Sequence, residues 1–185
     1  MRSRRPIEVE AYERAYAVLP SPEHLEELLD VLRRVEDLQR LEPALALAAA
    51  EAEDPYEQRS LLIEHAELCL SRLDLESDGL ASLREALLIE ADEVLARRAQ
   101  ALYERLQDWA GVADMQEVLV DLAEDESSMA RRVHRLGILF AERLEAPERA
   151  LAAFQRAAEL DETWLEPLRE SARLLLRLQR FAELV

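Results

Sequence analysis

The sequence has little glycine, few aromatic residues and a single cysteine. Its 185 residues include 3 Gly, 5% aromatic residues and Cys69 alone. β-Branched residues are also few, whereas Ala, Leu, Glu and Arg, which favour helices, dominate. A lone cysteine excludes an internal disulfide framework, and the composition as a whole predicts an all-α protein.

Long uncharged apolar runs are missing as well. No stretch approaches about 18 such residues, so the sequence predicts no membrane span. The basic start of the chain is not followed by an apolar segment, so we expect no secretory signal. A single cysteine fits a reducing compartment, and we predict a cytoplasmic location. Lysine and asparagine are absent, which we interpret as a bacterial coding bias.

The charge is strongly of one sign. The chain has 23 basic residues, all of them Arg, against 40 acidic ones, and its net charge is −17. Such a charge argues against nucleic acid and anionic membranes as partners. Half of the residues are apolar, so a sizeable core can be buried.

One short pattern occurs three times. It reads LQRLEPA from Leu38, LQDWAGV from Leu106 and LQRFAEL from Leu178. Degenerate copies at Leu73 and Leu144 mark the midpoints, and the mean step is about 35 residues, a period typical of stacked helix pairs. We therefore expect Leu38, Leu106 and Leu178 to end the first helix of a pair, with the second helix starting at Leu41, Trp109 and Phe181.

A second pattern carries a family resemblance. AYERA at 11–15 matches AFQRA at 153–157, which lies about four repeats further on. In the stretch 131–162, Leu136, Gly137 and Phe140 followed by Ala150, Phe154 and Ala157 resemble the signature of the tetratricopeptide repeat (TPR). The resemblance implies a right-handed α-solenoid of antiparallel helix pairs, and a related α-solenoid is the alternative.

We predict about ten helices. Their approximate ranges are 7–19, 22–38, 41–53, 56–73, 79–91, 92–107, 109–124, 128–144, 147–160 and 163–178. Residues 1–5 are expected to form a flexible basic arm, and 6–185 a single TPR-like solenoid with a half repeat, four helix pairs and a terminal helix. The apolar run LLLRL at 174–178 favours neighbours on both sides. It suggests part of a longer array, or self-association through the C-terminal helix.

Catalytic and metal chemistry receive little support from the sequence. His65 and Cys69 are one helical turn apart and could reach one metal ion. Because only two ligands are visible, we interpret both as facing the seam between helices, with no metal and no cofactor. Acidic pairs are expected by chance among 40 acids, and phosphate-binding or nucleophile motifs are absent. The sequence therefore predicts a protein that is not an enzyme.

The family resemblance also implies where a partner would bind. In TPR-like arrays, the first helices of successive pairs line a concave groove. The stripe next to the core stripe on these helices predicts the partner-binding residues Leu29, Arg33, Ile63, Arg97, Arg131, His134, Arg135, Ile138, Arg169 and Arg173. Glu166 and Glu170 precede two of these arginines by three residues, so internal ion pairs are the alternative to a binding patch.

The functional hypothesis is a non-catalytic scaffold for protein interactions. Its groove would bind a peptide or helix that carries acidic and apolar anchors. Two alternatives remain open at this point. One is an accessory TPR segment of a larger bacterial regulator or enzyme, such as a kinase or transcription factor, and the other is a self-assembling structural spacer.

Overall fold

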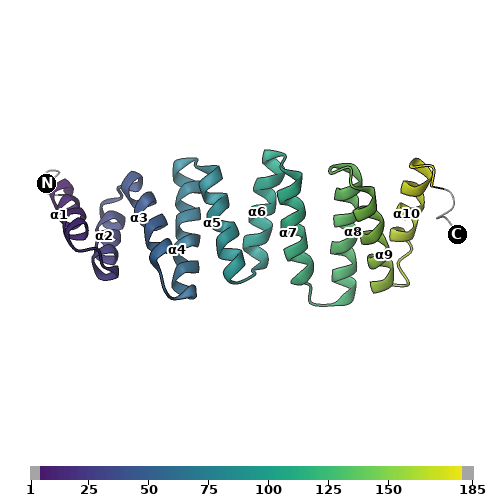
Figure 1. The fold of residues 1–185 in the computed structure, drawn as a ribbon, viewed down its shortest axis with the longest axis horizontal. Coiled ribbons are helices and arrows are strands. Elements are labelled where there is room, and N and C mark those ends of the chain that lie inside the picture. Colours follow the sequence, from purple (N-terminus) through teal and green to yellow (C-terminus); the bar gives the residue numbers. More distant parts are fainter. Residues whose placement is uncertain (1–4, 181–185) are drawn as a thin grey trace. The chain divides into compact units, whose positions relative to one another are not determined.

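The computed structural model describes residues 5–180, with side chains from residue 8 onward, and this part of the chain is all-α. Ten α-helices follow one another in it (Figure 1), as predicted. They are α1 (Arg5–Val18), α2 (Pro22–Val35), α3 (Leu38–Glu51), α4 (Pro55–Leu68), α5 (Glu76–Ile89), α6 (Glu93–Leu106), α7 (Trp109–Asp121), α8 (Glu126–Glu142), α9 (Pro147–Leu160) and α10 (Glu166–Arg177). A π-helical turn, η1 (Cys69–Leu73), continues α4.

The chain divides into two compact units, the first ending at Glu90 and the second beginning at Ala91. Within each unit, every helix packs against the next one in the sequence and runs antiparallel to it. The single solenoid predicted for residues 6–185 stays a prediction. Of the predicted basic arm at 1–5, only Arg5 belongs to the described part, where it is the first residue of α1.

The helix boundaries repeat every 71 residues. Adding 71 to both bounds of α1 gives those of α5, and adding 71 again gives those of α9. The same shift carries α2 onto α6 and the first residues of α3 and α4 onto those of α7 and α8. The structural repeat is thus a block of four helices, or two pairs of the predicted mean length.

A polar residue in the left-handed backbone conformation follows the first helix of every described pair. The φ angles of these residues lie between 49° and 58°, and the residues are Glu36, Asp74, Gln107, Glu145 and Gln179. This conformation reverses the chain, but it favours glycine and costs other residues about 1–2 kcal/mol. The three glycines of the chain are therefore free for other positions.

The reversals are of two kinds, which alternate along the chain. After Glu36 and Gln107 the next amide donates to a carbonyl five residues back, from Asp37 to Leu32 over 3.2 Å and from Asp108 to Tyr103 over 2.9 Å. At the wider turns, the corresponding bond spans six residues, as from Ala146 to Phe140 over 2.9 Å. The first helices that precede the wider turns are longer, since η1 continues α4 to Leu73 and α8 extends to Glu142. Alternate pairs therefore differ in length.

The first LQ stretch was assigned to the wrong place in the repeat. Leu38 was expected to end a helix, but it is the first residue of α3, and α2 ends three residues earlier at Val35. With the 71-residue shift, Val35 corresponds to Leu106, and Leu38 corresponds to Trp109. Leu106 does end its helix as predicted, whereas Phe181 lies outside the described residues.

Aspartate side chains begin five of the helices. Each accepts a hydrogen bond from a backbone amide of the first helical turn, and these residues are Asp37, Asp54, Asp92, Asp108 and Asp125. A carboxylate there satisfies a free amide and interacts favourably with the helix dipole. Hydrogen bonds from Ser128 lower the pKa of Asp125 accordingly. Part of the acidity of the chain therefore has a structural cause.

The glycines make room where two helices of a pair meet. A Cβ atom on Gly137 of α8 would lie 2.6 Å from a ring carbon of Phe154 on α9, and one on Gly111 of α7 would clash with the ring of Tyr103 on α6. Phe154 is 2% exposed. The close approach of Gly137 and Phe154 agrees with the roles that the family resemblance implied for them.

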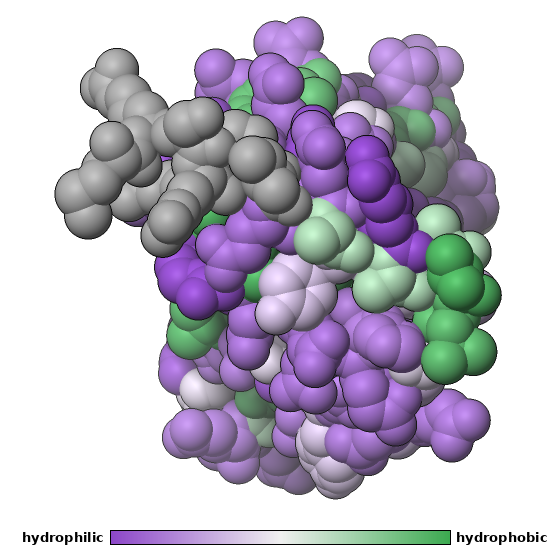
Figure 2. Space-filling model, turned by 90° about the vertical axis from the view of Figure 1, so that its left-hand side faces the viewer, coloured by the Kyte–Doolittle hydropathy of each residue, from purple (hydrophilic) through white to green (hydrophobic). Residues whose placement is uncertain are grey.

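The surface at the α1 end is mainly hydrophilic. Figure 2 views this end and shows hydrophobic side chains only in small groups among polar ones. Within residues 5–180, no helix combines the length and the apolar character that a bilayer span requires.

Replacing Gly137 with Ala should destabilise the fold although Ala is the better helix former. The added methyl group meets the buried ring of Phe154, and overpacking costs about 1–3 kcal/mol. This exceeds the gain in helix propensity of about 1 kcal/mol. Gly79→Ala is the comparison, because it meets Leu70, a half-buried side chain that can change rotamer. In urea unfolding followed by circular dichroism, an equal loss for both variants would contradict this explanation.

Replacing Gln107 with Gly should raise the unfolding free energy by about 0.5–1 kcal/mol, because Gly relieves the left-handed strain at a small entropic cost. Gln155→Gly on α9 is the control. Gln155 lies inside a helix, where Gly costs about 1 kcal/mol. Urea unfolding should show opposite signs for the two variants, and destabilisation by Gln107→Gly would count against the account of the reversal.

Candidate functional site

The second unit has a cavity of about 290 Å³ between α6, α7 and α8. Side chains on one face of each helix line it, since they recur at three- and four-residue steps. The lining residues are Arg97, Gln100, Glu104, Trp109, Val112, Gln116, Leu119, Arg132, Arg135, Ile138, Leu139, Glu142 and Arg143. Four arginines and two glutamates thus surround an apolar surface. Three of the predicted partner-binding residues, Arg97, Arg135 and Ile138, meet here.

Two of the four arginines are already paired. The Glu93 carboxylate accepts hydrogen bonds from Arg97 at 2.6 and 2.9 Å and from Arg132 at 3.0 Å. Arg132 also donates to the backbone carbonyl of Leu119. The hydrogen bonds from Arg132, and then those from Arg97, lower the pKa of Glu93. These two arginines therefore line the cavity with their charge already paired within the protein.

The other two arginines have no carboxylate partner within the described part of the chain. Arg135 is exposed in the middle of α8. Arg143 lies with its guanidinium 4.6 Å from the ring centre of Trp109, a cation–π contact that leaves its hydrogen-bond donors free. Arg135 and Arg143 lie two helical turns apart on the cavity side, and both can donate to an anionic ligand.

An ion pair joins α2 and α4 in the first unit, but not the equivalent positions of α6 and α8 in the second. In the first unit, Arg33 binds both carboxylate oxygens of Glu64, at 2.8 and 2.7 Å. The 71-residue shift converts this pair into Glu104 and Arg135, with the charges exchanged. Glu104 instead accepts from Gln100 at 3.0 Å. The position of Arg135 can therefore hold an ion pair in this fold, but Glu104, at the equivalent position in the same cavity, makes its hydrogen bond with Gln100.

Two predicted residues line a different cavity. Leu29 and Arg33 lie at a cavity of about 420 Å³ in the first unit, between α2, α3 and α4. Its charged lining is acidic apart from Arg33 and consists of Glu26, Glu51, Glu53, Asp54 and Glu57. Ile63 is half-buried on α4 and lines neither cavity. The predicted partner-binding residues thus lie at two cavities whose charged linings have opposite signs.

The remaining predicted residues make internal contacts. Arg131 donates to the Ser127 hydroxyl at 2.7 Å. Arg169 pairs with Glu166 at 3.2 Å and Arg173 with Glu170 at 2.5 Å, as the alternative of internal ion pairs predicts.

His134 lies in the core, whereas the stripe had placed it towards a groove. It is 8% exposed, and its ring lies 4.7 Å from that of Trp164 and 5.5 Å from that of Phe154. Conversely, the stripe missed Trp109 and Arg143. They lie in contact with each other, where α7 begins and α8 ends, and the 71-residue spacing between turns is the signal that would have located them.

The arrangement of helices now defines the fold. Antiparallel helix pairs recur in both units. In the pair of α8 and α9, Gly137 of the first helix packs against the ring of Phe154 on the second. The fold is TPR-like. Its Ala150 and Ala157, both 0% exposed, complete the helix contact that the sequence resemblance implied.

Solved structures with TPR-like folds are similar to this chain. A tetratricopeptide repeat protein from Parabacteroides merdae is 18% identical, with 88% of this chain and 62% of that one covered and a TM-score of 0.44. MamA from Desulfovibrio magneticus is 17% identical, with 85% of both chains covered and a TM-score of 0.40. The TPR2AB domain of yeast Sti1 in a pHSP90 complex is 13% identical, with 95% and 78% covered and a TM-score of 0.40. No family model and no curated protein matches the chain. At these identities the likeness concerns the fold alone.

His134→Leu should reduce the acid sensitivity of the TPR-like fold. Burial lowers the pKa of His134, and Arg135 adds to this effect, while Glu170 and Glu166 oppose it. The folded state therefore favours the neutral ring. Its stabilisation is present above the unfolded pKa near 6.5 and is lost as the pH falls through the folded pKa. Urea unfolding between about pH 7 and pH 5 should show a steeper loss for the wild type. Equal slopes would contradict this expectation.

Proposed function

We propose that this TPR-like protein is a non-catalytic interaction scaffold, and that the cavity between α6, α7 and α8 binds an acidic peptide segment with an apolar anchor. The observation that carries the proposal is the pair Arg135 and Arg143, which face an apolar surface and have no carboxylate partner among the residues that the structure describes. Guanidinium groups match the planar geometry of carboxylates and bind them through two parallel hydrogen bonds.

The apolar part of the cavity supplies the anchor site. Val112 and Leu119 are buried at its base, and Trp109, Ile138 and Leu139 are partly exposed around them. A leucine or phenylalanine side chain that removes this surface from water gains about 25 cal/mol per Å². Apolar contact then gives affinity, and the arginines select the charge of the neighbouring residues.

The negative charge of the whole chain does not exclude an acidic ligand. Residues 1–90 contain 10 Arg and 21 acidic residues, a net charge of −11, whereas residues 91–185 contain 13 Arg and 19 acidic residues, a net charge of −6. Salt screens exposed charges beyond about 8 Å at physiological ionic strength. The charges nearest the cavity, four arginines against Glu93, Glu104 and Glu142, therefore dominate the field that a bound peptide meets.

Replacing both Arg135 and Arg143 with Glu should abolish this binding. The probes are short labelled peptides in which Glu alternates with Leu or Phe, and matched peptides with Lys in place of Glu. Hydrogen bonds to charged groups contribute about 1.5–3 kcal/mol each, so affinity for the acidic peptides, measured by fluorescence polarisation, should fall at least about tenfold.

The control is the double variant Arg84→Glu and Arg156→Glu. Both residues are exposed on helices outside the cavity, and the double substitution changes the net charge by the same amount. It should leave the affinity nearly unchanged. Preference of the wild type for the Lys peptides, or equal loss of affinity in both double variants, would reject the proposal.

A further inference from the structure

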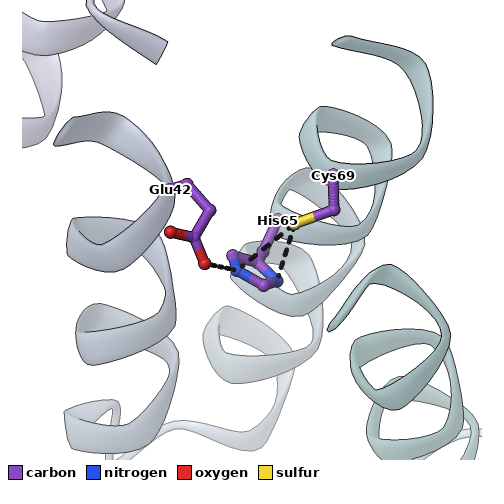
Figure 3. Close-up of side chains that lie close together, drawn as sticks. All are labelled: Glu42, His65 and Cys69. Carbon is purple, nitrogen blue, oxygen red and sulfur yellow. Dashed lines mark hydrogen bonds and ion pairs between the residues drawn. The ribbon is translucent and has the colours of Figure 1, made fainter. Parts of the chain in front are cut away.

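A buried polar cluster in the first unit lies apart from the peptide cavity. It joins Glu42 of α3, His65 of α4 and Cys69 at the start of η1 (Figure 3). His65 is 4% exposed and Cys69 0%, so both lie in the seam between helices, as the sequence predicted. Glu42, which the sequence did not associate with them, brings a third side chain that can ligate a metal ion.

The fold does not require polar side chains at this place. The 71-residue shift carries Glu42, His65 and Cys69 onto Ala113, Leu136 and Phe140 of the second unit. It likewise carries Ser82, which contacts His65, onto Ala153. All four counterparts are apolar, and each is less than 9% exposed. Because the same helix contacts form with an apolar core in the second unit, packing alone does not explain the polar cluster in the first.

The distances between the ligand atoms suit a tetrahedral site. His65 Nε2 lies 3.1 Å from Glu42 Oε1 and 3.6 Å from Cys69 Sγ, and one atom of each residue lies within 4.8 Å of the other two. Zinc binds N, O and S ligands at about 2.0–2.3 Å, which gives tetrahedral edges of about 3.3–3.6 Å. Cys69 Sγ also lies 3.8 Å from His65 Nδ1, beside the ring, so the Cys69 side chain must rotate to bring Sγ and Nε2 to one cation.

The fourth residue, Ser82, orients the imidazole. Its Oγ lies 2.8 Å from His65 Nδ1. When Nδ1 carries the proton and donates to this hydroxyl, the lone pair of Nε2 is free on the side of Glu42, whose Oε1 lies 3.1 Å away. Histidines that bind metals almost always make such a bond with the other ring nitrogen, which fixes the tautomer.

Charge supports the same assignment. Within residues 5–180, no arginine pairs with Glu42, and its only ionic partner there is His65. A divalent ion would balance one carboxylate and one thiolate. Because the Glu42 side chain is 25% exposed, water can reach the fourth position.

We propose that Glu42, His65 and Cys69 bind one thiophilic divalent cation of the zinc type through Oε1, Nε2 and Sγ. The ion links α3 to α4, which belong to successive helix pairs. Binding releases the thiol proton of Cys69. In a neutral ring with the proton on Nε2, that proton moves to Nδ1, which donates to Ser82 Oγ, and only a doubly protonated ring releases a proton as well. The competing explanation is a hydrogen-bonded network in which Nε2 donates to Glu42 and the Ser82 hydroxyl donates to Nδ1.

Cobalt(II) distinguishes the two explanations, because a thiolate ligand gives a charge-transfer band in the near ultraviolet. Cys69 is the only cysteine of the chain, so this band reports on the cluster alone. The 185-residue chain, treated with chelator and reductant, should develop the band with one equivalent of Co²⁺ and lose it when Zn²⁺ is added. Absence of the band in the wild type would leave only the hydrogen-bonded network and overturn the proposal.

Three variants test the ligand set. Cys69→Ser should lose the band, Glu42→Gln should weaken Co²⁺ binding at least about tenfold, and Ser82→Ala should weaken it about 10–100-fold. Glu85→Gln, an exposed position on α5, is the matched control and should bind like the wild type. Far-ultraviolet circular dichroism checks that each variant is folded. Unchanged affinity in a folded Glu42→Gln variant would overturn the three-ligand site.

Discussion

The structure depends on how the chain reverses direction after the first helix of each pair. A polar residue takes the left-handed conformation there, and its neighbour's amide binds a carbonyl of the preceding helix. The strain of these residues is offset when the apolar faces of two helices come together. Because the reversals alternate between a tight and a wide form, α4 with η1 and the long α8 occupy equivalent places. Cys69 lies in one of these extended segments, and the last turn of α8, which lines the cavity between α6, α7 and α8, lies in the other.

The sequence predicted the all-α fold, the number of helices and the mean length of a pair. These features follow from local properties, namely helix propensity, the period of apolar residues and the small and aromatic residues around Gly137 and Phe154. The register of the first pair was wrong because the LQ pattern at Leu38 matches Leu106 by residue type alone. The hydrogen bonds that end α2 involve Glu36 and Asp37, which do not resemble glycine-rich helix ends.

The candidate site was predicted only in part. Of the predicted partner-binding residues, Arg97, Arg135 and Ile138 line one cavity, because residues at three- and four-residue steps share a face of a helix. It could not show which arginines are neutralised, since this depends on side-chain geometry and on contacts between helices. The hydrogen bond between Glu42 and His65, which are 23 residues apart in the sequence, likewise depends on a contact between helices.

The two units have equivalent helices but different polar side chains at equivalent positions. Where the first unit has a carboxylate, an imidazole and a thiol, the second has alanine and larger apolar residues. Where the first has a closed pair of arginine and glutamate, the second has an arginine with open donors. In a solenoid, a helix contacts only its neighbours, so a polar group introduced in one pair leaves distant pairs undisturbed. Separate sites can therefore develop in one short chain without a change of fold.

The constant offset of 71 residues also bears on how such a chain can change in length. The bounds of α1, α5 and α9 are equivalent. A deletion of 71 residues, starting at any position of a block, therefore removes four helices and joins the chain at equivalent positions. The order of helix types and the alternation of tight and wide turns stay the same across the junction. Genetic recombination between blocks can therefore shorten or extend the array at almost any position, including inside a helix, without placing a tight turn where a wide one belongs.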